Sequence, residues 1–285
     1  DLVNPARYYQ SLHRRMTTMS VIQCNGADLY YEGHGEGQPI VFLHGATAGL
    51  RYFEPQLKSM SADYRTIAVD FRGHGRSEKT ELGHTIQHYA EDVRSFLSQL
   101  GLDDVILVGW SMGAIVSWEY IHQSGTDRIR ALIDIDMEPS PLKREGYDYG
   151  SYELDDLEEA VSQIQTSPIE LLDQQAKAML SEPPRRELRN LILDEGSRSP
   201  APIQGALLCG LLYLRDYRDV LAEIDVPTLV CAGADEKWRS VASVRSVAEL
   251  VTNAQFELFE NSGHCLTVEE PERFNRVVGN FIDSL

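Results

Sequence analysis

The stretch Val105-Ile-Leu-Val-Gly-Trp-Ser111-Met-Gly113 decides the fold. Its apolar residues 105–108 predict a buried strand, and residues 114–122 directly after it predict a helix. A serine between two glycines in a strand–turn–helix connection is the G-x-S-x-G pattern of a nucleophile elbow. Only small residues fit two places on either side of this serine, because the strand and the helix approach closely there. We therefore predict that Ser111 is a nucleophile at a helix N-terminus, where developing negative charge is favoured.

Similar apolar runs occur along most of the chain. Near-continuous runs of β-branched and other apolar residues are typical of strands that are buried on both faces of a parallel sheet. These runs, each ending in glycine or an acidic residue, cover 39–45, 66–70, 105–109, 129–136 and 227–233. Segments with a helical period lie between them, for example 86–100. The alternation predicts an α/β fold with a mostly parallel, doubly wound sheet.

One segment, 139–219, interrupts this alternation. It contains seven prolines and no strong strand, so we interpret it as a helical cap inserted after the sixth strand. The predicted division is an N-terminal arm at 1–20 without assigned chemistry, an α/β core at 21–138 and 220–285, and the cap at 139–219. An acidic cluster lies in the cap and is expected over the pocket entrance, where it would favour neutral or cationic substrates over anionic ones. Its members are Glu153, Asp155, Asp156, Glu158 and Glu159.

Two loops supply the other groups that a serine nucleophile needs. His44-Gly-Ala46 ends an early strand, and the backbone N–H groups of Ala46 and Met112 are expected to form an oxyanion hole. His264 lies on a loop that follows a late strand at 255–259. Histidine is close to neutral at working pH, so His264 is the predicted general base. We interpret His44 as a residue that orders its own loop.

Together these motifs resemble the α/β-hydrolase superfamily. The resemblance rests on the strand before His44-Gly, the Ser111 elbow, the Ser-Gly-His264 loop, and the stretch Asp70-Phe-Arg-Gly-His-Gly-Arg-Ser77. The elbow G-W-S-M-G is similar to that of serine esterases of the non-haem haloperoxidase type. The likeness extends from about residue 21 to the end of the sequence and is weakest in the cap. It implies an α/β-hydrolase fold, a Ser-His-acid triad, and a structural turn at 70–77.

The sequence leaves the triad acid open. The family's usual acid follows the seventh strand, three residues past a glycine; counted from Gly233, this position is Glu236, and Asp235 directly precedes it. The family's proline four residues further on is replaced by Ser240. Asp136, at the end of the sixth strand, resembles the acid of a subgroup in which an Asp-Met-x-Pro motif precedes the cap. Asp136, Glu236 and Asp235 are therefore alternatives.

The resemblance implies hydrolysis of a carboxylic ester, or a related acyl bond, through an acyl-enzyme intermediate. Ser111 would attack the carbonyl, His264 would carry the proton, and neither a metal nor an organic cofactor would be needed. A lactonase or a perhydrolase of the haloperoxidase type are alternatives on the same residues, and a non-catalytic ligand receptor is an alternative of another class. Trp110 is expected to form one wall of an apolar pocket for short to medium acyl chains.

The composition further limits the class of protein and the partners that we expect. With 285 residues, of which 42% are hydrophobic, the chain can form a sizeable core. The formal net charge of −18 disfavours binding to nucleic acid. No apolar run reaches the ~18 residues of a membrane span, and four cysteines without a CxxC pair are expected to be reduced thiols. We therefore expect a cytoplasmic protein with a small-molecule acyl substrate, no nucleic-acid or membrane partner, and a possible homo-oligomer.

Overall fold

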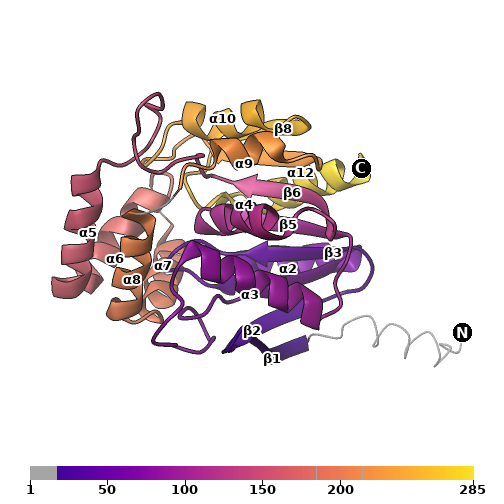
Figure 1. Cartoon of the computed structure of the whole chain (residues 1–285), viewed down its shortest axis with the longest axis horizontal. Helices are drawn as coiled ribbons and strands as arrows, with labels where there is room; N and C mark the ends of the chain where they lie inside the picture. Colours follow the sequence, from indigo (N-terminus) through magenta and orange to yellow (C-terminus); the bar gives the residue numbers. More distant parts are fainter. Residues whose placement is uncertain (1–17, 184, 213–214) are drawn as a thin grey trace, which may run out of the picture.

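The computed structural model describes residues 18–183, 185–212 and 215–285, and its centre is an eight-stranded sheet (Figure 1). The strand order is β1-β2-β4-β3-β5-β6-β7-β8. The six strands from β4 to β8 in this order are parallel, whereas β2 pairs in antiparallel fashion with both β1 and β4. The predicted, mostly parallel sheet is thus confirmed. The strands are β1 (Thr18–Cys24), β2 (Ala27–His34), β3 (Pro39–Leu43), β4 (Arg65–Val69), β5 (Val105–Trp110), β6 (Ile129–Ile135), β7 (Thr228–Gly233) and β8 (Ala254–Phe259).

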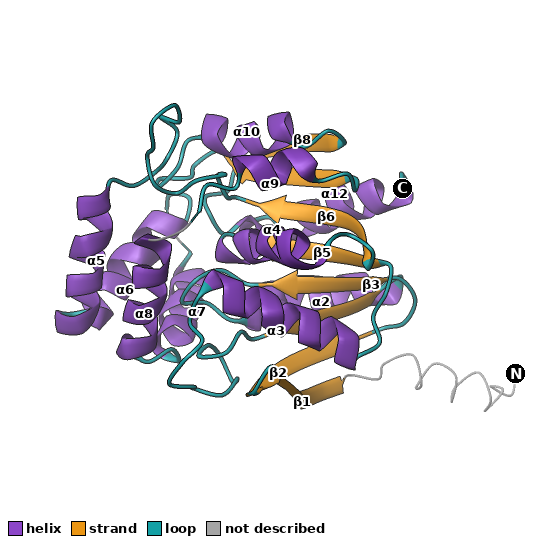
Figure 2. Cartoon of the chain, viewed as in Figure 1, coloured by secondary structure: helices purple, strands orange, loops and turns teal. Residues whose placement is uncertain are grey.

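Helices cover both faces of the sheet (Figure 2). Around the core the described helices are η1 (Leu50–Phe53), α2 (Glu54–Ser59), η2 (Met60–Ala62), α3 (Ile86–Gln99), α4 (Met112–Ser124), α9 (Arg218–Glu223), α10 (Val241–Leu250), α11 (Leu266–Glu269) and α12 (Pro271–Asp283). Alternate side chains of β3 face opposite sides, so that Val41 and Leu43 pack with α3, α4, α9 and α10, while Ile40 and Phe42 pack with α2, α11 and α12. The central strands are buried on both faces, which explains their continuous apolar sequences.

A group of four helices lies beyond the carboxyl ends of the strands, toward which the arrowheads of β3 and β6 point (Figure 1). These helices follow β6 and are α5 (Leu154–Thr166), α6 (Pro168–Met179), α7 (Arg186–Ser197) and α8 (Ala201–Leu212). They occupy the segment for which a cap is predicted. The next helix, α9, extends across the predicted boundary at 219 and packs on the core through Val220 and Leu221. The division into domains stays a prediction.

At the other end of the chain, β1 begins at Thr18 and pairs with β2 from Thr18↔Gly33 onward. The last three residues of the predicted arm therefore belong to the sheet, because they extend a hairpin that is already formed. Residues 1–17 lie outside the described part of the chain. None of the helices in the described residues is long and apolar enough to cross a membrane. The four cysteines are free thiols, and three of them are buried.

Candidate active site

Ser111 lies in a strained turn between β5 and α4. Its backbone has φ +54° and ψ −119°, which is unusual for a residue with a side chain, and its N–H donates a 2.8 Å hydrogen bond to the carbonyl of Ile135 on the neighbouring strand. A Cβ atom on Gly113 would lie 2.1 Å from the carbonyl oxygen of Leu43, and one on Gly109 would lie 2.5 Å from the backbone of α4. The two glycines of the motif thus permit the close approach of strand and helix that the sequence predicts.

The loop after β3 is held by His44. The N–H of Phe71 donates to Nε2 of this buried ring at 3.0 Å, so the ring proton is on Nδ1, which donates to the carbonyl of Gly45 at 2.7 Å. Burial lowers the pKa of His44 to about 4 and keeps the ring neutral. In a trans peptide the C=O and N–H point in opposite directions. Fixing the carbonyl of Gly45 therefore also fixes the direction of the Ala46 N–H, and Ala46 lines the cavity described below.

His264 is anchored from the core and from the cap. Its N–H donates to the carbonyl of Met179 in α6 at 2.8 Å, and its own carbonyl accepts a 2.8 Å hydrogen bond from Nε1 of Trp110. The ring of Trp238 makes an edge contact with the imidazole at a centroid distance of 5.2 Å. Trp110 is thus both a wall of the cavity and a support for the loop that carries His264. Its expected role in substrate binding stays a prediction.

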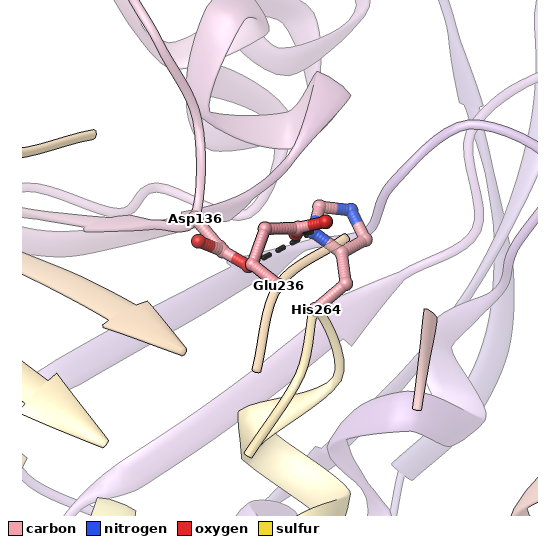
Figure 3. Close-up of side chains that lie close together, drawn as sticks. All are labelled: Asp136, Glu236 and His264. Atoms are coloured by element: carbon pink, nitrogen blue, oxygen red, sulfur yellow. Dashed lines mark hydrogen bonds and ion pairs between the residues drawn. The ribbon is translucent and has the colours of Figure 1, made fainter. Parts of the chain in front are cut away.

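Two acidic side chains meet the same nitrogen of His264 (Figure 3). Nδ1 lies 3.0 Å from Oδ2 of Asp136 and 2.6 Å from Oε2 of Glu236. Both side chains are buried, with exposed fractions of 0% and 1%. Asp235 is exposed, and none of the described contacts joins its carboxyl group to His264. Two of the three sequence alternatives are therefore brought to the imidazole together, since β6 and β7 are neighbours and both acids follow the carboxyl ends of these strands.

The two acids differ in their electrostatic environment. Burial, together with the nearby charge of Glu236, raises the pKa of Asp136 to about 8. Burial acts in the same direction on Glu236, but His264 and the guanidinium of Arg239 outweigh it and lower the pKa of that carboxyl. Burial lowers the pKa of His264, whereas Glu236 and Asp136 raise it more, so its pKa lies above the ordinary value. The site therefore favours a protonated imidazole, as a general base requires after it has accepted a proton.

Arg239 and Glu138 complete this cluster and were not singled out from the sequence. Nε of Arg239 donates to Glu138, and Nη1 lies 3.4 Å from Oε2 of Glu236 and 3.0 Å from Nδ1 of His264. Arginine and its partner Glu138 are both buried. The available signal was weak: each charged residue lies two or three positions after a candidate acid, in a loop where charge is common.

The same cluster bears on metal binding. One ligand atom each from Asp136, Glu236 and His264 lies within 4.8 Å of the others, which is compact enough to hold a metal ion. However, the guanidinium of Arg239 already places a positive charge against Glu236 and His264. A cation at this position would meet that charge at close range, so the donor set suits an imidazole orientation better than a metal centre.

A cavity of about 340 Å³ joins these groups. Ser111, His264, Ala46, Met112 and Trp110, all predicted from the sequence, line it together. Its remaining walls are mostly apolar and come from the elbow, the loop after β6 and the helices α5, α6 and α8. Along α5 the residues at a spacing of four face the cavity, and they include one member of the acidic cluster. This stripe begins at Tyr152, just before the helix, and continues on α5 with Asp156, Ala160 and Ile164.

Comparisons with known proteins agree with the fold. Residues 40–277 match a family described as the alpha/beta hydrolase family. The chain is 29% identical over 263 residues to the AB hydrolase superfamily protein YisY of Bacillus subtilis, covering 90% of this chain and 96% of the relative. It is 27% identical to a non-heme chloroperoxidase of Kitasatospora aureofaciens, with coverages of 91% and 97%. An esterase structure from Exiguobacterium antarcticum superposes with a TM-score of 0.89 at 26% identity, covering 93% and 100%. The chain belongs to the α/β-hydrolase family.

Proposed function

We propose that the protein hydrolyses uncharged carboxylic esters through an acyl-enzyme intermediate on Ser111. The observation that carries this proposal is the cavity and the groups that line it. Ser111 at the elbow, His264 held by carboxylates, and the loop after β3 that contains Ala46 (the oxyanion loop) meet there between mostly apolar walls. The similarity to an esterase and to a non-heme chloroperoxidase supports an acyl-transfer reaction. Hydrolase and esterase chemistry is thus a property of the family, and the roles of the individual residues form the proposal.

In the proposed reaction, His264 accepts the proton of Ser111 as Oγ attacks the ester carbonyl. The negative charge that develops on the carbonyl oxygen is stabilised by the N–H groups of Ala46 and Met112. His264 then donates the proton to the leaving alcohol, and the acyl group remains on Ser111. A water molecule, activated by the same histidine, releases the acid and restores the enzyme. The strained backbone at Ser111 keeps the hydroxyl at the N-terminus of α4, where this charge is favoured.

The lining of the cavity supports a substrate without negative charge. Among the described residues that line it, Arg239 is the only lysine or arginine. Its guanidinium already pairs with two carboxylates, those of Glu138 and Glu236. A carboxylate on the substrate would therefore find no uncompensated cation there and would have to lose its hydration. The volume, about 340 Å³, lies at the small end of ligand pockets and favours short to medium acyl chains.

A series of p-nitrophenyl esters with increasing acyl chain length tests the proposal directly. We expect saturable turnover that is highest for short to medium chains and that is lost in Ser111→Ala. A matched variant, Cys209→Ser, changes an exposed thiol away from the cavity lining and should keep the wild-type profile. Turnover that persists in Ser111→Ala, or a preference for long-chain lipid esters, would contradict the proposal.

Cyclic esters and hydrogen peroxide extend the same series. A lactone is an ester whose leaving group stays attached, and peroxide can replace water in releasing the acyl group from Ser111. The similarity to a non-heme chloroperoxidase favours the second of these reactions as a side activity. Adding peroxide should then divert part of the acyl-enzyme to peracid, and Ser111→Ala should remove ester hydrolysis and peracid formation together.

A further inference from the structure

Asp136 and Glu236 place two acidic side chains where a Ser-His-acid arrangement needs only one carboxylate, so the protonation state of each acid matters. The facing oxygens of the two groups lie within 4.8 Å of each other, next to a single Nδ1–H of His264. Both side chains are almost completely removed from water. Two negative charges at this distance in a buried site repel strongly, so such a pair holds on to one proton.

The hydrogen-bond donors around the pair indicate which member keeps the proton. Glu236 accepts a 2.7 Å hydrogen bond from the N–H of Trp238, faces Nη1 of Arg239 at 3.4 Å, and is the nearer acid to His264. Donors of this kind stabilise the ionised form of a carboxyl group. Among the described residues, His264 is the only hydrogen-bond donor recorded at the Asp136 carboxyl, whose other neighbour is the Glu236 carboxyl itself, and Oδ1 of Asp136 has no hydrogen-bond partner. The neutral form is therefore better accommodated at Asp136, and the opposite pKa shifts of the two acids agree with this.

Arg239 accounts for the asymmetry. Its guanidinium is anchored on Glu138, which fixes it beside Glu236 and away from any described contact with Asp136. With one proton on the pair, the buried groups Glu138, Glu236 and Arg239 carry one net negative charge. When His264 takes up the proton of Ser111, the cluster becomes neutral. A second ionised carboxylate would instead leave an unbalanced charge buried at that moment.

The other titratable groups that face this cluster do not change its net charge. They include Tyr152 from the start of the cap, Cys231 on β7 and Cys265 beside the imidazole. Burial raises the pKa of the Tyr152 hydroxyl to about 12 and raises the pKa of both thiols. All three therefore stay neutral at ordinary pH.

We propose that Asp136 and Glu236 act as a pair that shares one proton, with Asp136 neutral and Glu236 ionised, and that Arg239 on Glu138 is the positioning residue that keeps the charge on Glu236. This inference rests on the proposed function only for the role of His264 as base. The protonation of the pair itself is a property of the resting protein, and it is measurable without substrate.

Infrared spectroscopy of the folded protein at neutral pH tests the protonation. A neutral carboxyl group has a C=O absorption distinct from that of a carboxylate, and Asp136→Asn should remove one such absorption from the wild-type spectrum. The matched control is Asp134→Asn, because Asp134 is a second buried carboxyl, on β6 just before Asp136, and has its own raised pKa. Loss of a signal in Asp136→Asn that is separate from the one lost in Asp134→Asn supports the proposal. A spectrum of Asp136→Asn that equals the wild type overturns it, whether or not any ester is hydrolysed.

Kinetics with a neutral ester test how the pair acts. Asp136→Asn keeps a neutral hydrogen-bonding group and should lower kcat by about tenfold or less, whereas Glu236→Gln removes the preferred anion and should cost about a hundredfold. In that variant Asp136 can ionise and partly replace Glu236, so the double variant should lose about 10⁴-fold, as when a triad loses its only acid. If Asp136→Asn alone is as damaging as the double variant, Asp136 is the sole ionised acid and the proposal fails.

The position of Arg239 is tested by the pH profile of kcat/KM. Arg239→Met is combined with Glu138→Gln, so that the carboxylate that anchors Arg239 is not left unpaired in the interior, while Glu236 loses the cation. Without the cation, the pKa values of Glu236 and His264 both rise, and the acid limb should move to higher pH by about one unit. Arg239→Lys keeps the charge and should keep the limb near its wild-type position. An acid limb that does not move in the folded double variant would rule out this role of Arg239.

Discussion

Replacing His44 by phenylalanine separates the packing of its ring from its two hydrogen bonds. The ring lies 4.7 Å from Phe71 and 5.2 Å from His74, centroid to centroid, and a phenyl ring fills the same space. The substitution leaves the carbonyl of Gly45 and the N–H of Phe71 without their present partners. Each buried group without a partner costs about 1–3 kcal/mol, so the free energy of unfolding should fall by about 2–6 kcal/mol.

The catalytic effect of the same change follows from the peptide geometry. Once the carbonyl of Gly45 is released, the N–H of Ala46 is no longer aimed by its own peptide plane. Loss of one oxyanion donor costs about 10²–10³-fold in kcat, and a donor that is displaced but still present should cost about 10–10²-fold. KM should change little, because this donor acts mainly on the charge that develops in the transition state.

The assay is the hydrolysis of a neutral ester at a temperature where urea unfolding shows the variant to be folded. His74→Phe is the matched control: His74 is equally buried, contacts the carbonyl of Arg72 and packs against the ring of His44, but none of the described hydrogen bonds joins its side chain to the loop after β3. Because a phenyl ring keeps the packing against His44 and both hydrogen bonds of His44 remain, this variant should lower stability while keeping kcat within about threefold. A folded His44→Phe protein with wild-type kcat would refute the role that we assign to this ring.

Two further predictions concern charge. Asp134 is buried beside Trp118, and burial raises its pKa to about 8, whereas an aspartate in the unfolded chain ionises near about 3.9. The unfolded state therefore loses its proton first as the pH rises. The free energy of unfolding should fall by up to about 4 kcal/mol between about pH 5 and about pH 8. Asp134→Asn should flatten this dependence in urea unfolding, and an unchanged slope would contradict the assignment. Asp156, the member of the acidic cluster that lines the cavity, should disfavour anionic esters by about twofold relative to matched neutral ones. In Asp156→Asn the side chain can still accept the hydrogen bond from the N–H of Glu153, and this variant should remove the twofold effect, as should about 0.1 M salt or more. Equal rates for the two kinds of ester in the wild type at low salt would contradict this role of Asp156.

The fold and the nucleophile could be predicted from sequence because their signals are local. The apolar run at 105–108 and the two glycines around Ser111 are dictated by the strand–turn–helix connection itself. His264 could be predicted for a similar reason, because its loop directly follows β8 and because it comes after Ser111 and the candidate acids along the chain, as the fold requires. In each case the residues that fix the local geometry lie close together in the sequence.

The acid could not be chosen from sequence, because the choice depends on contacts between separate loops. Asp136 and Glu236 are 100 positions apart, and only the pairing of β6 with β7 brings both to one nitrogen. Arg239 and Glu138 meet for the same reason. The acidic cluster illustrates the opposite limit: Glu153 and Asp156 form a capping box at the start of α5, a local role that a charge pattern alone does not reveal.

The central claim is that Ser111 is the activated nucleophile of this cavity. Intact-protein mass spectrometry after treatment with a fluorophosphonate, followed by peptide mapping, measures it directly. We expect a single adduct on Ser111 in the wild type, loss of ester hydrolysis in step with labelling, and no adduct in Ser111→Ala. Folded wild-type protein that stays unlabelled, or that is labelled at another residue, would contradict it.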